Sequence, residues 1–128
     1  MLRLYRFCLG IAECEGYIPP SGKLYPVGSR SWRNNNPGNL RSSIFEWKNV
    51  ENFSVFASEM DGWQALLYDV RMKALGKSRT GLTGESTIKE FVKVWAPDTD
   101  GNAPDLYVRN LCKFTGFVPS MKLKDLLL

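Results

Sequence analysis

Apolar residues recur at helical spacing over the first fifteen residues and predict one helix there. Steps of three and four residues connect them into a stripe that ends at Glu15. The stripe consists of Leu4, Tyr5, Phe7, Cys8, Ile11 and Ala12. Gly16 stands in the position of a helix C-cap, so we expect the helix to end there. Glu13 falls on the polar side, with Arg3 and Arg6.

Helical spacing returns after residue 58 and predicts four more short helices. They are expected at about 58–76, 87–96, 104–116 and 120–127. Ser58 can cap the first of these helices, and Thr87 with Glu90 forms a capping-box pattern before the second. Gly76 and Gly116 follow the apolar positions as C-cap glycines. The C-terminal half of the chain is therefore predicted to be helical.

The intervening segment, residues 17–52, is rich in Gly, Pro, Ser and Asn and predicts irregular structure. Its aromatic residues indicate a folded lobe, with a short β-hairpin expected near residues 40–56. We therefore predict a mainly α (α+β) fold of about five helices and an irregular loop lobe, with a cleft between the lobes. A chain of 128 residues is long enough for one domain, which we place at 1–128.

Composition narrows the chemistry that this chain can perform. Histidine is absent, and the three cysteines lack the spacing of a zinc site, so we expect no metal or cofactor and assign catalysis to carboxylates. The net charge of +4 favours an anionic partner, but the basic residues are scattered, which argues against nucleic acid. No run is long enough to span a membrane, and the first helix lacks a signal-peptide cleavage site.

Glu15 is the first candidate catalytic residue. A carboxyl group held against apolar side chains is destabilised in its charged form, so its pKa should rise toward the value that a general acid needs. The alternative is an ordinary glutamate in the last turn of a helix. The first helix alone does not decide between the two interpretations.

The segment 33–41 is the most unusual in the chain and reads Arg-Asn-Asn-Asn-Pro-Gly-Asn-Leu-Arg. Asparagine tolerates left-handed backbone and bonds to nearby backbone groups, so the segment could be an elaborate turn. Its amides could equally form a hydrogen-bonding wall for the N-acetyl and hydroxyl groups of a sugar. Both interpretations stay open at this point.

The order of motifs resembles phage and prophage proteins of the lysozyme-like superfamily and, more distantly, bacterial glucosaminidases. The motifs are Ala12-x-x-Glu15-Gly16, the segment 33–41, Phe53-x-x-Phe56-x-Ser58-x-x-x-Gly62-Trp63-x-Ala65-Leu66, and Trp95-Ala96-Pro97 with Asn102 and Tyr107. The resemblance covers residues 7–117. It implies a lysozyme-like fold and a peptidoglycan glycosidase, such as an endolysin, that cleaves the β-1,4 bond between N-acetylmuramic acid and N-acetylglucosamine.

The resemblance also implies roles for individual residues. Glu15 would be the catalytic acid, and Asn36, Asn39, Ser58 and Tyr107 would lie near the substrate. Trp32 and Tyr25 lie in a polar segment and are our candidates for stacking on sugar rings. The remaining aromatic residues of the motifs are assigned to the core. They are Phe53, Phe56, Trp63 and Trp95.

The mechanism depends on a second carboxylate, for which Glu46 or Glu51 is the sequence-based choice. Without one, Glu15 could act as acid and then as base on the sugar's own C6 hydroxyl, as in lytic transglycosylases, and we favour this route slightly over hydrolysis. The competing hypothesis is a catalytically inactive cell-wall-binding or virion structural module of the same fold.

The expected setting follows from the same hypothesis. The partner would be the glycan strands of peptidoglycan, and we expect a monomer that binds neither nucleic acid nor membrane. The protein would be made in the bacterial cytoplasm without its own signal peptide. It would act at the cell wall or periplasm, or as part of a phage particle.

Overall fold

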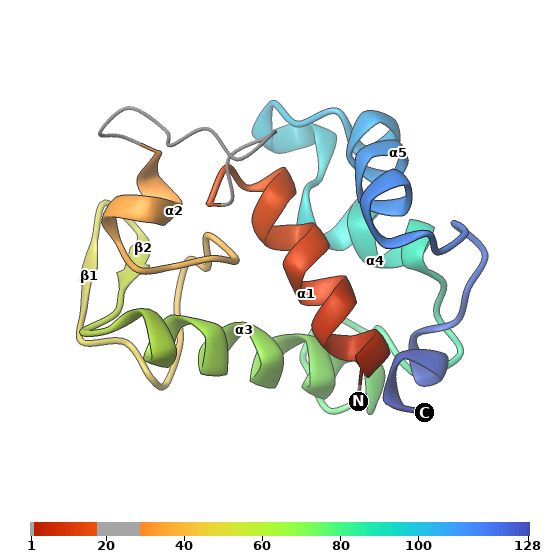
Figure 1. Ribbon diagram of the computed structural model, residues 1–128, viewed down its shortest axis with the longest axis horizontal. Helices are drawn as coiled ribbons and strands as arrows, with labels where there is room; N and C mark the ends of the chain where they lie inside the picture. The colour runs from red at the N-terminus through yellow and green to blue at the C-terminus, as the bar shows by residue number, and fades with distance from the viewer. Residues whose placement is uncertain (1, 18–28) are drawn as a thin grey trace. The chain divides into compact units, whose positions relative to one another are not determined.

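The computed structural model describes residues 2–17 and 29–128, which are mainly helical with one small antiparallel sheet. Its α-helices are α1 Leu2–Cys14, α2 Arg30–Arg33, α3 Glu59–Ala74, α4 Ile88–Trp95 and α5 Pro104–Thr115 (Figure 1). Its strands are β1 Lys48–Val50 and β2 Phe53–Val55, and its short 3-10 helices are η2 Asp98–Asp100 and η3 Leu123–Leu127. The mainly α, α+β prediction is confirmed.

The predicted helix starts are confirmed by their caps. The Ser58 hydroxyl accepts a hydrogen bond from the backbone N–H of Asp61 at 3.1 Å at the start of α3. Before α4, Thr87 and Glu90 form the complete capping box. Pro104 occupies the first turn of α5, where its missing N–H costs no helical hydrogen bond.

The glycines end the helices as expected. Gly16, Gly76 and Gly116 have φ values of 80°, 72° and 77°, the left-handed backbone that glycine adopts without steric cost. After α1, the N–H of Gly16 bonds to the carbonyl of Glu13 and the N–H of Tyr17 to that of Ala12. These two bonds form a Schellman motif, which fixes the chain direction directly after Glu15.

The predicted hairpin is also present. Strands β1 and β2 pair antiparallel, with Val50 opposite Phe53, which leaves Glu51 and Asn52 as a two-residue turn. Both turn residues have positive φ, 53° and 68°, as a type I′ turn requires. Figure 1 shows the two strands side by side.

Two elements differ from the prediction. The short helix α2 lies in the segment expected to be irregular, because a four-residue helix presents too few positions for a periodic pattern. The last predicted helix is the 3-10 helix η3 rather than an α-helix. Its Leu123 and Leu126 are nevertheless fully buried.

The backbone divides into two compact units, which we describe separately. Unit 1 is Met1–Gly10 with Asp69–Leu128, and unit 2 is Ile11–Tyr68. In unit 1 the ring of Phe91 contacts Phe7 edge-on at 5.1 Å and stacks on Trp95 at 5.2 Å between centroids. No helix of the described residues is both long enough and apolar enough to cross a membrane.

The C-terminal segment closes unit 1 by pairing with the residues before α4. The N–H of Leu123 bonds to the carbonyl of Ser86 at 2.8 Å, and that of Lys124 to Gly84 at 2.9 Å. On the surface, the Glu85 carboxylate bridges Lys122 and Lys124, each at 2.7 Å. Hydrogen bonds and charges of these two lysines lower the pKa of Glu85 to about 2.

Cys8 lies in the core of unit 1, and we expect its buried thiol to lower the folding stability of the protein at alkaline pH. Burial, and secondarily the negative charge of Asp69, raise the pKa of its thiol above the usual value. Since the unfolded chain loses this proton above about pH 8.5 and the folded chain keeps it, folding stability must fall as pH rises. By pH 10, urea denaturation should measure a loss of about 2 kcal/mol. The Cys8→Ala variant should lack this loss, and equal slopes for both proteins would contradict the assignment.

Candidate functional site

Glu15 lies at the junction between the end of α1 and the Schellman turn. Its side chain is half-buried, and its backbone N–H continues the helix by bonding to Ile11 at 2.8 Å. Its backbone carbonyl accepts a hydrogen bond of 2.9 Å from the Ser31 hydroxyl, which is itself buried. The position of Glu15 is thus fixed from two sides, by its own helix and by α2.

The short helix α2 has a clear structural role in this region. Ser29 caps it by accepting a hydrogen bond from the N–H of Trp32 at 3.2 Å. Because Ser31 points inward to Glu15, its neighbour Trp32 faces outward and is 49% exposed. Trp32 therefore has exposed ring area, as a sugar-stacking residue must. Tyr25, the other stacking candidate, lies outside the described residues.

An aromatic cluster surrounds the turn that follows Glu15. The buried Tyr17 contacts Trp32 and Trp63, with ring centroids 5.5 Å apart in each pair. The hydroxyl of Tyr17 hydrogen-bonds to Glu59, the first residue of α3. Burial first, and then this hydrogen bond and the Glu59 charge, raise the pKa of Tyr17 above its usual value.

This cluster was only partly predictable. Trp63 was assigned to the core together with Phe53, Phe56 and Trp95; the two phenylalanines are buried, whereas both tryptophans are half-buried. Tyr17 and Glu59 were not among the predicted site residues. Tyr17 carried one usable signal, because the residue after a C-cap glycine commonly packs back on its helix. No local pattern links Glu59 to Tyr17.

Asn36 holds the asparagine segment together. Its side chain is fully buried, and its Nδ2 donates to the carbonyls of Leu40 and Ser54 at 2.9 and 3.0 Å. Its Oδ1 accepts from the N–H of Leu40 at 2.9 Å. The amide is thus used entirely by backbone partners, including a residue of β2. We therefore assign Asn36 a role in the architecture of the loop, and its place near the substrate stays a prediction.

The rest of the segment also behaves mainly as an elaborate turn. Asn35 and Asn39 have φ values of 51° and 50°, and Asn35 Nδ2 donates to the carbonyl of Phe56 at 3.1 Å. Asn39 differs from its neighbours, because its Oδ1 is buried without a hydrogen-bond partner among the described residues. Among these three side chains, Asn39 is therefore the one with a buried acceptor that has no partner among the described residues.

Helix α3 packs unusually closely against this segment. A Cβ atom on Gly62 would overlap the carbonyl oxygen of Asn35, and it would lie 2.9 Å from Cδ of Pro37. A Cβ atom on Gly38 would lie 2.7 Å from the side chain of Leu66. Glycine at both positions thus allows the backbone of the loop to contact the helix.

The other two predicted binding residues lie in different units. Ser58 is exposed in unit 2, and its hydroxyl already accepts the capping hydrogen bond of α3. Tyr107 lies half-buried on α5 in unit 1. Glu15, Trp32, Asn36 and Asn39 belong to unit 2 together with Ser58.

Glu46 is held inside the hairpin lobe. Its Oε1 accepts hydrogen bonds from the Ser54 hydroxyl at 2.8 Å, the Ser43 N–H at 3.1 Å and Asn49 Nδ2 at 3.3 Å. Desolvation raises the pKa of Glu46, but these three hydrogen bonds outweigh it, and the pKa lies below the usual value. Glu51 is exposed in the hairpin turn. Glu46 therefore has a role in folding the lobe, independent of any catalytic one.

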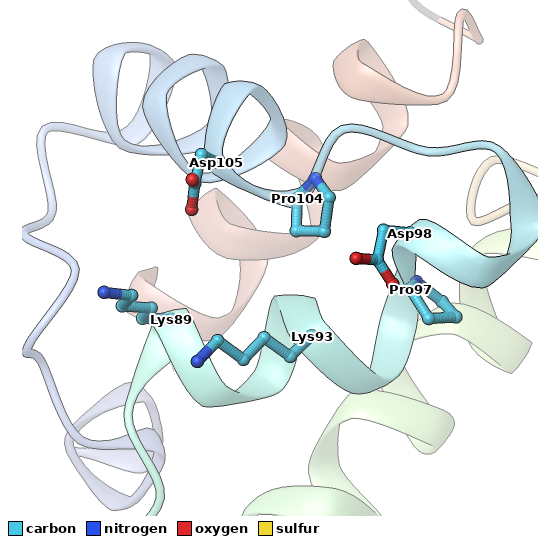
Figure 2. Close-up of a pocket in the computed structure, with 6 residues that line it drawn as sticks. All are labelled: Lys89, Lys93, Pro97, Asp98, Pro104 and Asp105. Atoms are coloured by element: carbon cyan, nitrogen blue, oxygen red, sulfur yellow. The ribbon is translucent and has the colours of Figure 1, made fainter.

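Unit 1 contains a separate surface hollow of about 520 Å³ between α4 and the start of α5. Lys89 and Lys93 lie on α4, and Asp105 lies across from them on α5 (Figure 2). Asp98 lies beside Pro97, shortly after the end of α4. Its lining carries charges of both signs on exposed side chains and none of the predicted site residues. We therefore keep the candidate site at Glu15.

Comparisons with family models, with curated proteins and with solved structures find no match for this chain.

Proposed function

We propose that this chain is a peptidoglycan-cleaving glycosidase of lysozyme-like fold, with Glu15 as the general acid. The observation that carries the proposal is the placement of Glu15 directly after α1, a helix with one buried face, with its carbonyl bonded to Ser31 at 2.9 Å. A general acid must be held in position and partly shielded from water, and a half-buried glutamate at a fixed turn meets both requirements.

The neighbours of Glu15 support a saccharide as substrate. Trp32 follows Ser31 directly in the chain and offers an exposed ring to stack against the apolar face of a sugar. Asn39 belongs to the same unit as Glu15, and its place near the substrate is part of the proposal. The bond cleaved would be the β-1,4 link between N-acetylmuramic acid and N-acetylglucosamine, by muramidase or lytic transglycosylase chemistry.

The biological setting is part of the same proposal. The partner is the glycan strand of bacterial peptidoglycan, and the protein acts as a monomer at the cell wall or as part of a phage particle. Its net charge of +4 favours association with an anionic wall polymer.

The test compares Glu15→Gln with the matched control Glu13→Gln on purified peptidoglycan. Loss of the proton donor should lower the rate of muropeptide release by about 100-fold to 10,000-fold. Glu13 is also half-buried near the end of α1, but it lies on the other side of the helix, so its variant should retain wild-type activity. Release is measured by mass spectrometry, and circular dichroism verifies that both variants are folded.

The competing function is a wall-binding module without activity. It predicts that wild type and both variants sediment with peptidoglycan sacculi and release no muropeptides. Equal release by wild type and Glu15→Gln would instead contradict the role of Glu15.

A further inference from the structure

We propose that Glu59 is the second carboxylate of the site and acts as the base that activates a water molecule. This inference rests on the proposed glycosidase function and goes beyond it, because it assigns the reaction to hydrolysis. The observation behind it is that two aromatic donors hold Glu59 beside the turn that carries Glu15.

The contacts of Glu59 fix its carboxyl group in place. Trp63 Nε1 donates to its Oε1 at 3.5 Å, and the hydroxyl of Tyr17 hydrogen-bonds to the same group. Tyr17 and Trp63 also contact each other edge-on. Because Tyr17 and Trp63 pack against each other and both bind Glu59, the Glu59 side chain loses much of its conformational freedom. A catalytic group must be positioned in this way.

Tyr17 relates Glu59 to the turn that carries Glu15. Glu15 precedes it by two residues, which is less than about 8 Å between Cα atoms, while Glu59 lies at its hydroxyl end. All three residues belong to unit 2. In glycosidases that invert configuration, acid and base lie about 6.5 to 9.5 Å apart, with a water between them. The proposal requires this spacing between the carboxyl groups of Glu15 and Glu59.

Glu59 also has the access to solvent that a base needs. Its side chain is exposed, whereas Tyr17 beside it is buried. A carboxylate offers about four lone-pair sites, so two ring donors leave sites for a water molecule. Glu46, the sequence-based choice, instead receives three hydrogen bonds from its own lobe at one oxygen.

The reaction balances with one water molecule. Glu15 gives its proton to the leaving glycosidic oxygen as the bond to the anomeric carbon breaks. The water oxygen bonds to that carbon, and the water's proton passes to Glu59. Exchange of one proton with solvent restores both glutamates. The product carries a hydrated reducing end, whereas transglycosylation without water would leave an anhydro end.

The first experiment compares Glu59→Gln with Asp61→Asn on purified peptidoglycan. Glutamine keeps an acceptor for both ring donors but cannot take a proton, so kcat should fall by about 100-fold or more while KM changes little. Asp61 lies in the same turn of α3, and its variant should keep wild-type kcat. Wild-type kcat in Glu59→Gln, or anhydro ends from the wild type, would overturn the inference.

A second experiment separates catalysis from a structural role. In Glu59→Ala the missing carboxylate leaves room for azide, and 1 M sodium azide should restore activity at least tenfold. The product should be a glycosyl azide, in which the nitrogen bonds to the anomeric carbon as Glu15 protonates the leaving oxygen. A folded Glu59→Ala protein without azide rescue and without azide product would overturn the role.

The outcomes for the two proposals can be told apart. Loss of activity in Glu15→Gln together with full activity in Glu59→Gln would overturn the role of Glu59 and leave the glycosidase function standing. A folded wild type that releases no muropeptides would overturn both.

Discussion

Replacing Gly62 with alanine is expected to destabilise unit 2 by about 2 to 4 kcal/mol, because the new methyl group has no space. It would overlap the carbonyl oxygen of Asn35 and come within 2.9 Å of Cδ of Pro37. Neither obstacle is the mobile end of a side chain, so the loop backbone or helix α3 must shift. A shift of Asn35 would also strain the loop around Asn36, which follows it directly.

An opposing effect must be weighed against this clash. Alanine is favoured over glycine inside a helix by about 1 kcal/mol, so a harmless site would gain stability. The steric cost at Gly62 is the larger effect because backbone atoms resist displacement. Urea denaturation of Gly62→Ala measures the balance, and Gln64→Ala, at an exposed position of α3, controls for an added alanine. Equal or higher stability of Gly62→Ala would contradict the close packing.

The sequence predicted those structural features that depend on interactions between residues close together in the chain. The cap of α3 at Ser58 and the box of Thr87 with Glu90 are bonds between residues three apart, so the sequence carries the whole signal. The same is true of Gly16, where the left-handed backbone favours glycine in any context. The hairpin was expected within a broad range, but its turn at Glu51 and Asn52 was not predictable from Gly-based turn signals.

The site could be predicted only in part because its contacts join residues far apart in the chain. The link from Ser31 to the carbonyl of Glu15 spans sixteen residues, and Ser31 belongs to a helix too short to show a period. Tyr17 and Glu59 meet across forty-two residues. The sequence offered no reason to expect either contact, because a serine or a glutamate in a polar segment is ordinarily assigned to the surface.

The segment 33–41 had two interpretations, one as a substrate-binding surface and one as a turn. The resemblance implied that Asn36 and Asn39 both approach the substrate, whereas the turn interpretation assigned them to the backbone. Asn36 follows the turn interpretation in full, because all its bonds are to backbone groups. The backbone of Asn39 is also part of the turn, and its buried Oδ1 has no partner among the described residues, so its place near the substrate stays a prediction.

Asn36→Asp is therefore expected to be among the most damaging single changes in unit 2, at about 4 kcal/mol or more. The substitution keeps size and shape but replaces the Nδ2 donor with an oxygen that faces the carbonyls of Leu40 and Ser54. Each buried carbonyl that loses its donor costs about 1 to 3 kcal/mol, and a buried carboxylate without a cation adds further cost. Chemical denaturation, followed by tryptophan fluorescence from Trp32 and Trp63, measures the loss.

Asn52→Asp provides the matched control, because Asn52 is exposed in the hairpin turn and aspartate tolerates its positive φ. A surface change of this kind should alter stability by less than about 0.5 kcal/mol. A stable, folded Asn36→Asp protein that has lost only glycan binding would favour the substrate-binding interpretation of Asn36 over the structural one. Unfolding of Asn36→Asp beside a stable Asn52→Asp would instead establish that the buried amide joins the loop to the hairpin and thereby supports the segment next to Ser31 and Glu15.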